Sequence, residues 1–123
     1  MSPEEASRAI GRHWRFYETP AGSRPVREFL DRIGDDDRDA VVAGMARVRQ
    51  YGLSRARHLR GDIWELRVDG QAEAFRVLFA PEGKKGRVLL AIEAFSKKTA
   101  KTPPQQIDLA EGRLKDWRGR AGS

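Results

Sequence analysis

The sequence contains no cysteine, and this absence excludes several kinds of site. Disulfides, iron–sulfur clusters, thiolate zinc sites and cysteine nucleophiles all require a thiol. Histidine is scarce, since only His13 and His58 are present, so a structural zinc site is not expected. Aromatic residues make up only 8 % of the 123 residues, against 34 % charged residues. We expect a thin hydrophobic core under a highly charged surface, with no bound metal and no cofactor.

Long hydrophobic runs are absent as well. No stretch approaches the roughly 20 apolar residues that span a bilayer, so no membrane partner is expected. The first ten residues, MSPEEASRAI, lack the basic-then-apolar order of a signal peptide. A length of 123 residues suits one domain rather than two. We therefore expect a single cytoplasmic domain.

The net charge of +6 is concentrated towards one end of the sequence. Residues 1–83 carry 14 basic and 14 acidic side chains, whereas residues 84–123 carry 10 basic and 4 acidic ones. A further basic stretch, residues 47–60, holds five arginines and no acidic residue. Local excesses of positive charge attract polyanions, above all the phosphates of nucleic acids. The alternative is that these charges serve only solubility and helix ends.

The N-terminal half predicts a short strand and two helices. Residues 13–18 alternate as a strand does, and a helix then begins just before Pro25, which fits its first turn. A second helix is predicted over residues 35–51, with aspartates at its start and Gly52 as its stop. The residues predicted to face the core from these helices are Val26, Phe29, Leu30, Ile33, Val41, Met45 and Val48.

The middle of the sequence predicts an antiparallel meander of three strands, over residues 64–69, 75–79 and 87–95. The strict alternation sets which residues face each other. The predicted cross-strand pairs are Arg67 with Arg76, Leu66 with Val77, and Val77 with Leu90. This register places Val88, Leu90 and Ile92 on the apolar face and Glu65, Arg67, Arg76, Ala91 and Glu93 on an open, charged face.

A last helix is predicted after Thr102, which forms a capping box with Gln105, with Pro103 at the first helical position. Its apolar stripe consists of Ile107, Ala110, Leu114 and Trp117. Residues 118–123 are expected to form a frayed basic tail, and residues 1–12 a loosely attached extension. A single α+β domain over residues 13–117 follows from these elements.

Three blocks of the sequence resemble those of a bacterial toxin family. Residues 59–67, LRGDIWELR, are similar to its signature L-x-G-x-[IL]-W-E-L-R, and residues 75–79, FRVLF, resemble its following strand. Residues 95–103, FSKKTAKTP, resemble its third block, which continues here with Ile107, Ala110 and Arg113. On these residues the chain is similar to the HigB-like branch of the RelE-type toxins, which includes the phage-derived Gp49-like proteins.

The resemblance implies the toxin of a type II toxin–antitoxin pair. Such toxins are metal-independent endoribonucleases that cut mRNA during translation on the ribosome. A helix-turn-helix antitoxin neutralises them, and operator DNA is bound only through the complex. The implied RelE-like fold is a small antiparallel sheet with two N-terminal helices packed on one face and a C-terminal helix, which agrees with the elements predicted above.

The chemistry of metal-free RNA cleavage fits basic residues of this chain. A base must deprotonate the 2′-hydroxyl, cations must stabilise the charged phosphorane, and an acid must protonate the 5′-oxygen. Arg67 and Arg76 are the expected cations. Lys97 and Lys98 follow the third strand, where neighbouring cations can lower the pKa of a lysine towards that of a proton donor. The residues expected to contact RNA are Arg57, His58, Arg60, Lys101 and Arg113.

The general base stays open at this point. Many relatives carry a histidine two residues before the phenylalanine of the third block, where this chain has Glu93. Glu93 is the candidate proton acceptor, and the alternative is a remnant in an inactive toxin; His58 is a further candidate. Arg67 has the alternative role of pairing with Glu65 or Glu93, and the lysine run that of a solvated loop. The alternative function is a non-catalytic module that binds RNA or a protein partner.

Overall fold

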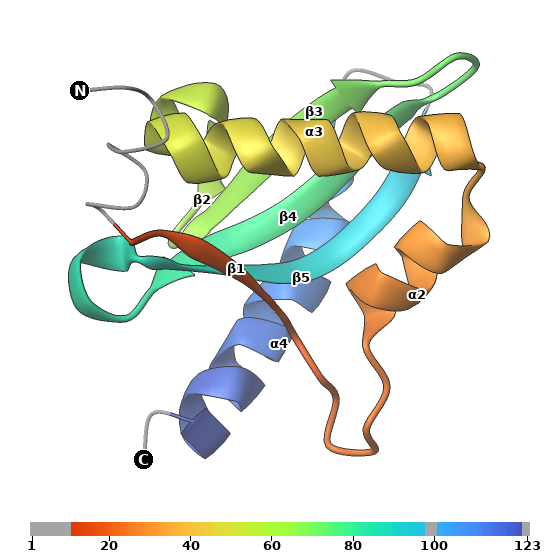
Figure 1. Cartoon of the computed structure of the whole chain (residues 1–123). Coiled ribbons are helices and arrows are strands. Elements are labelled where there is room, and N and C mark those ends of the chain that lie inside the picture. Colours follow the sequence, from red (N-terminus) through yellow and green to blue (C-terminus); the bar gives the residue numbers. More distant parts are fainter. Residues whose placement is uncertain (1–10, 98–100, 122–123) are drawn as a thin grey trace.

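A five-stranded mixed sheet lies at the centre of this computed structural model, in which residues 11–97 and 101–121 are described (Figure 1). The strands follow the order β1 (His13–Phe16), β5 (Val88–Lys97), β4 (Ala74–Glu82), β3 (Ile63–Asp69) and β2 (Arg57–Arg60). Helices α2 (Pro25–Arg32) and α3 (Asp35–Tyr51) pack on one face and α4 (Pro104–Ala121) on the other. The predicted α+β class is confirmed. No helix of the described residues is long and apolar enough to cross a membrane.

The two N-terminal helices form where the sequence predicts them. Helix α2 begins at Pro25, and α3 runs from Asp35 to Tyr51 and stops at Gly52, whose φ of +84° suits glycine. A Cβ on Gly44 of α3 would lie 2.8 Å from a methyl of Val68, so this glycine lets the helix approach β3 closely. The predicted residues that are buried are Val26, Phe29, Leu30, Val41, Met45 and Val48.

The first strand completes the sheet in a way that the sequence did not predict. Strand β1 pairs with β5 in the parallel direction, with His13 opposite Val88, so the sheet is mixed rather than antiparallel. Helices α2 and α3 and strands β2 to β4 lie between β1 and β5 in the sequence. A pairing between such distant segments leaves no local sequence signal. The Trp14 indole fixes β1 to α3, because its Nε1 donates a 2.7 Å hydrogen bond to the Met45 carbonyl.

The predicted register is correct between β3 and β4 and wrong between β4 and β5. Arg67 lies opposite Arg76 and Leu66 opposite Val77, as predicted. Val77, however, lies opposite Ala94, four residues further along β5 than the predicted Leu90, because β4 continues to Glu82, which pairs with Val88. The pairing also shifts by one residue after Leu78. Such a β-bulge leaves one extra residue on one strand and changes the parity of the pairing.

The face opposite α2 and α3 is not open, which corrects the predicted charged face. Leu90 and Ile92 lie on this face, opposite to the predicted side, because β5 is apolar on both faces and its alternation does not select one. Helix α4 packs on this face and forms a second core with it. This core consists of Tyr17, Ile63, Leu78, Ala80, Leu90, Ile92, Ala110 and Leu114.

Strand β2 was not predicted. It pairs with β3 through a tight turn at Gly61, which adopts a φ of +55°. The sequence RHLR of this strand carries no clear apolar alternation, and only the neighbouring β3 gives it a place at the edge of the sheet. Four residues of the basic stretch 47–60 thus become an edge strand.

The start of α4 differs from the predicted capping box. The helix begins at Pro104 instead of Pro103, and the Pro103 carbonyl accepts hydrogen bonds from the backbone N–H groups of Gln106 and Ile107. The Thr102 hydroxyl points into the protein and contacts Glu65 and Arg76, as described below. The Thr102 side chain, which local sequence rules assign to the helix cap, therefore binds buried polar groups instead.

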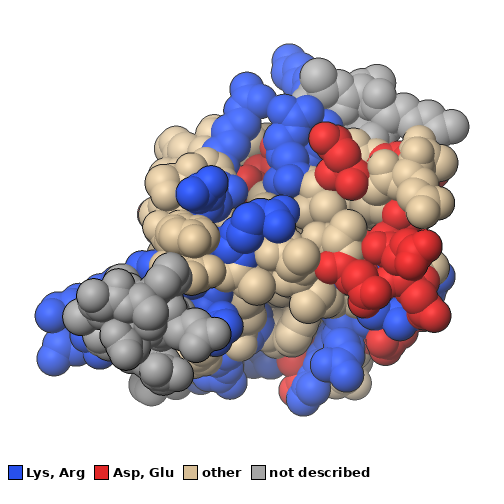
Figure 2. Space-filling model, turned by 45° about the horizontal axis from the view of Figure 1, so that its top comes forward, with Lys and Arg blue, Asp and Glu red and all other residues tan. Residues whose placement is uncertain are grey.

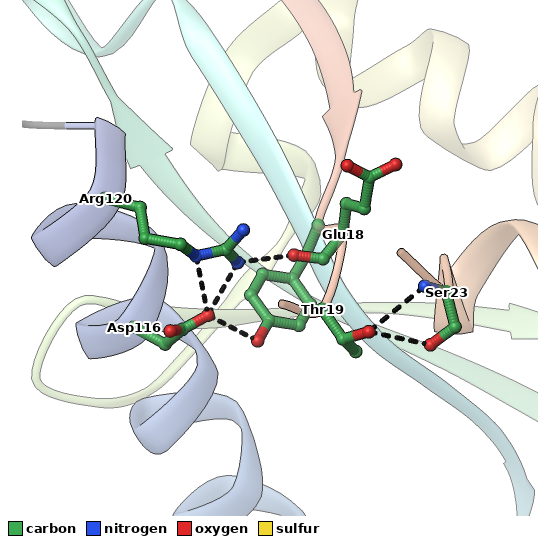
Figure 3. Close-up of polar contacts among 6 residues, drawn as sticks. Glu18, Thr19, Ser23, Asp116 and Arg120 are labelled. Carbon is green, nitrogen blue, oxygen red and sulfur yellow. Dashed lines mark hydrogen bonds and ion pairs between the residues drawn. The ribbon is translucent and has the colours of Figure 1, made fainter. Parts of the chain in front are cut away.

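The far end of α4 is anchored to the rest of the molecule, in contrast to the expected frayed tail. Arg118 bonds Glu82 at 2.7 Å and Asp62 at 3.0 Å, and the hydrogen bond to Glu82 raises the pKa of Arg118. Figure 3 shows Arg120 reaching both Asp116 and the Glu18 carbonyl, beside the bonded pair Thr19 and Ser23. The helix continues to Ala121, and residues 122–123 lie outside the described part.

The Tyr17 hydroxyl completes this network by donating a 2.7 Å hydrogen bond to Asp116. Burial and this hydrogen bond raise the pKa of Tyr17, and the same bond lowers the pKa of Asp116. At the other terminus, Arg12 donates hydrogen bonds to the carbonyls of Arg49 and Gln50 at the end of α3. The expected loose extension therefore does not include Arg12, and residues 1–10 lie outside the described part.

Candidate functional site

Three polar side chains from separate segments meet between the sheet and the start of α4. Glu65 of β3 and Arg76 of β4 are each 1 % exposed, and Thr102 is 7 % exposed. Arg76 Nη1 donates to Glu65 Oε2 at 3.4 Å and to Thr102 Oγ1 at 3.2 Å, and the Thr102 hydroxyl donates to the same Glu65 oxygen. The buried cluster of Glu65, Arg76 and Thr102 thus joins the sheet to the segment that leads into α4.

Arg67 lies next to this cluster but on its outside. Its Nε is 3.8 Å from Glu65 Oε1, and its side chain is 40 % exposed. Arg67 and Arg76 are cross-strand partners on one face of the sheet, as the sequence predicted, yet only Arg67 reaches the surface. The alternative pairing of Arg67 with Glu65 is present, and it orients the guanidinium at the protein surface.

Two shallow hollows lie beside the cluster and share Arg57. The smaller one has a volume of about 230 Å³, and the larger one about 390 Å³. Their lining residues are Ser54, Arg55, Ala56, Arg57, Glu65 and Arg67 in the smaller hollow, and Arg57, Leu59, Lys101, Thr102 and Ile107 in the larger. Glu65 and Thr102, one in each hollow, are bonded to each other, and Arg57 lines both, so the two hollows are neighbours. We call this pair of hollows the Arg57 site.

The Arg57 site is strongly basic at its rim. Arg57, Arg67 and Lys101 are exposed there, and neither Arg57 nor Lys101 forms an ion pair with an acidic residue of the described part. Figure 2 shows Lys and Arg side chains running through the upper and central part of one face, while Asp and Glu side chains gather at its right side. Guanidinium groups bind phosphate oxygens in pairs, so this rim suits a polyanion such as RNA.

Two residues that the sequence assigned to RNA contact are engaged within the protein. The His58 Nε2 lies 2.7 Å from the Gly61 carbonyl, and its ring centre lies 5.1 Å from that of Trp64. Arg60 forms ion pairs with Asp108 and Glu111 of α4, and the hydrogen bond with Asp108 raises the pKa of Arg60. Neither His58 nor Arg60 lines the two hollows.

Glu93 and Arg113 bind each other away from the Arg57 site. Arg113 Nη1 donates to Glu93 Oε1 at 3.2 Å and to the Ile92 carbonyl at 3.1 Å, and the guanidinium lies 5.7 Å from the centre of the Tyr17 ring. Their side chains are 21 % and 15 % exposed, for Arg113 and Glu93 respectively. Neither residue lines the two hollows.

The lysine run is only partly described. Lys97 ends β5, and the structure describes its backbone alone; Lys98 lies outside the described residues. Lys101 lines the larger hollow, as expected for an RNA contact on this loop. The Arg57 site therefore gathers Arg57, Arg67 and Lys101 from the predicted set.

Sequence reasoning missed the parts played by Glu65 and Thr102. Glu65 was placed on the correct face, but its contact with Thr102 depends on the course of the segment before α4, which no local pattern gives. The sequence around Thr102 fits a capping box, so it gave no indication of the contact between Thr102 and Arg76. Among the described residues, no group of three or more histidine and acidic side chains is arranged to hold a metal ion.

Comparison with known proteins identifies a matching family and similar proteins. Residues 28–115 match the family described as "Phage derived protein Gp49-like". The chain is similar to the "Probable endoribonuclease HigB1" of Mycobacterium tuberculosis, in strains CDC 1551 / Oshkosh and ATCC 25618 / H37Rv. The identity is 35 % over 108 residues, which cover 85 % of this chain and 84 % of each relative.

Proposed function

The chain belongs to the phage-derived Gp49-like family and is a HigB-like member of the RelE superfamily of toxins, and on this premise we propose that it is an endoribonuclease. Its proposed substrate is mRNA under translation on the ribosome in the cytoplasm. The similar proteins of Mycobacterium tuberculosis are named probable endoribonucleases, which supports RNA cleavage as the reaction class. A helix-turn-helix antitoxin is the proposed protein partner, and operator DNA the ligand of their complex.

The observation that supports RNA as substrate is the Arg57 site. Arg57, Arg67 and Lys101 line its two neighbouring hollows with exposed positive charge. A phosphate bound at this rim gains charge-assisted hydrogen bonds from planar guanidinium groups. The apolar lining by Leu59 and Ile107 in the larger hollow suits the flat face of a nucleobase beside that phosphate.

The proposed reaction needs no metal. The 2′-oxygen of a nucleotide attacks the adjacent phosphorus while a base takes its proton, and the bond to the 5′-oxygen breaks as an acid protonates that oxygen. The products are a 2′,3′-cyclic phosphate and a free 5′-hydroxyl, so atoms and protons balance. Arg67 is the proposed group that stabilises the doubly charged phosphorane, because its guanidinium is exposed at the site. Lys97 and Lys98 are the proposed proton donors.

Arg76 is proposed to act as a positioning residue. Its side chain is 1 % exposed and lies beneath Thr102, so it holds Glu65 rather than a phosphate. Glu65 in turn contacts Arg67 at the surface. Loss of Arg76 would then reduce cleavage through the orientation of Arg67.

Glu93 is the proton acceptor proposed from the sequence; it lies outside the Arg57 site and is paired with Arg113, and these surroundings define the competing function. Its carboxylate accepts hydrogen bonds from Arg113 and from the Ala94 backbone N–H. A carboxylate held in this way favours the second candidate, a module that binds RNA without cutting it. Glu93→Gln keeps the size of the side chain and removes its basicity. If Glu93 is the general base, the variant should cleave RNA about a hundredfold more slowly or worse. An unchanged rate of cleavage would show that Glu93 takes no part in the reaction.

Controlled expression in a bacterial host tests the proposed function. The wild-type chain should stop growth and shorten cellular mRNA, and a co-expressed antitoxin should restore both. Arg67→Ala should abolish the arrest, whereas Lys84→Ala, at an exposed cation in the turn between β4 and β5, should preserve it. Normal growth and intact mRNA with the wild-type chain would contradict the proposal.

A further inference from the structure

Tyr51 is a large aromatic side chain left at the surface beside the Arg57 site. It is the last residue of α3, and it is 47 % exposed. The Arg55 guanidinium lies over its ring, 4.6 Å from the ring centre. Arg55 also lines the smaller hollow together with Arg57 and Arg67. An aromatic ring and a guanidinium therefore stack at the edge of the basic hollow.

The local backbone holds this pair in place. Gly52 ends α3 in a left-handed conformation, and the 3₁₀ turn Gly52–Arg55 folds the chain back towards Tyr51. The Ser54 hydroxyl donates to the Tyr51 carbonyl at 3.3 Å, which closes the turn. Arg55 forms no ion pair with an acidic residue of the described part, and the residue is exposed. The stack is thus preformed and open to a ligand.

We propose that Tyr51 and Arg55 form a stacking platform for a nucleobase of the RNA whose phosphate binds Arg57 and Arg67. This inference rests on the proposed RNA substrate and extends it to a second contact. Bases splayed out of single-stranded RNA stack on aromatic rings and on guanidinium planes, and the positive charge of Arg55 adds to attraction for the neighbouring phosphate. Stacking tolerates every base, so the platform contributes affinity and orientation rather than a base preference.

An oligonucleotide with 2′-O-methyl riboses tests the platform without cleavage, because it lacks the attacking hydroxyl. A fluorescently labelled, unstructured hexamer and its abasic counterpart carry the same phosphates and differ only in the bases. Tyr51→Ala should weaken binding of the hexamer by roughly tenfold, the order expected for one stacked base. It should leave binding of the abasic oligomer unchanged, and Tyr51→Phe should bind both as the wild type does.

Two further variants separate stacking from charge and from the fold. Arg55→Lys keeps the charge and loses the planar group, so it should weaken binding of the hexamer and not of the abasic oligomer. Val42→Ala removes another exposed apolar side chain of α3, which is 50 % exposed, and should change neither affinity.

The outcomes distinguish this platform from the RNA site itself. Wild-type affinity of Tyr51→Ala for the hexamer, or an equal loss for both oligomers, would overturn the platform and leave the Arg57 site standing. A wild-type chain that binds neither oligomer would overturn both. Thermal unfolding of each variant shows that the comparison is made between folded proteins.

Discussion

Glu65 and Arg76 form an ion pair with 3.4 Å between Oε2 and Nη1, and each residue is only 1 % exposed. The pair lies beside a small domain's hydrophobic core, where removing charged groups from water is costly. Thr102 offsets part of this desolvation cost, because its hydroxyl forms hydrogen bonds with both the carboxylate and the guanidinium. The same carboxylate reaches Arg67 at the surface, so one buried group links the stability of the fold to the rim of the proposed RNA site.

Replacing Glu65 should strongly destabilise the protein. Glu65→Ala removes the carboxylate that faces the buried Arg76, and breaking such a pair costs about 3–5 kcal/mol in the free energy of unfolding. Urea denaturation followed by circular dichroism measures the change. Glu18→Ala is the matched control, since Glu18 and Arg24 pair at 3.2 Å while largely exposed. An exposed pair of this kind contributes about 0–1 kcal/mol, and equal effects of the two variants would contradict the buried role of Glu65.

Thr102 should stabilise the fold through its hydroxyl rather than as a helix cap. Thr102→Val keeps the shape and removes the bridge between Glu65 and Arg76, at an expected cost of about 1–3 kcal/mol in the free energy of unfolding. Thr102→Ser keeps a hydroxyl and should retain most of the stability. The same denaturation experiment distinguishes them, and a Val variant as stable as the Ser variant would show that the bridge is dispensable.

The limits of sequence reasoning are clearest at these residues. Alternation placed Arg67 and Arg76 on one face, because each residue in a strand has only two faces to choose from, and the turn at residues 70–73 was consistent with their pairing. Arg76 is buried against Thr102 while Arg67 is exposed, and no local pattern shows that the segment before α4 passes over Arg76. The bulge after Leu78 and the parallel pairing of β1 were not predicted either, since both arise from contacts between distant segments.

The Tyr17–Asp116 bond makes stability depend on pH at both extremes. The raised pKa of Tyr17 gives a contribution that is complete below about pH 10, the ordinary tyrosine value, and is lost as the pH rises through the folded value. The lowered pKa of Asp116 gives a contribution that is present above about pH 4 and is lost as the pH falls through its folded value. Tyr17→Phe should flatten the alkaline part of a plot of unfolding free energy against pH. An unchanged alkaline part would contradict this role of the Tyr17–Asp116 hydrogen bond.

The cations at the rim should each contribute one ionic contact to RNA. Arg67→Ala and Lys101→Ala should each lower the slope of log affinity against log salt by about 1, measured with the uncleavable hexamer. Lys84→Ala should leave the slope unchanged, because Lys84 lies in the turn between β4 and β5, outside the Arg57 site. Equal slopes for all three variants would show that binding is spread over the whole basic surface.

Mapping of mRNA ends in a purified translation system tests the central claim most directly. The same mRNA is incubated with the wild-type chain, with and without active ribosomes, and its new 5′ ends are located by primer extension. The account predicts cuts within the coding region only during translation, retained in Lys84→Ala and lost in Arg67→Ala. Intact mRNA with the wild-type chain, or equal cutting by Arg67→Ala, would contradict it.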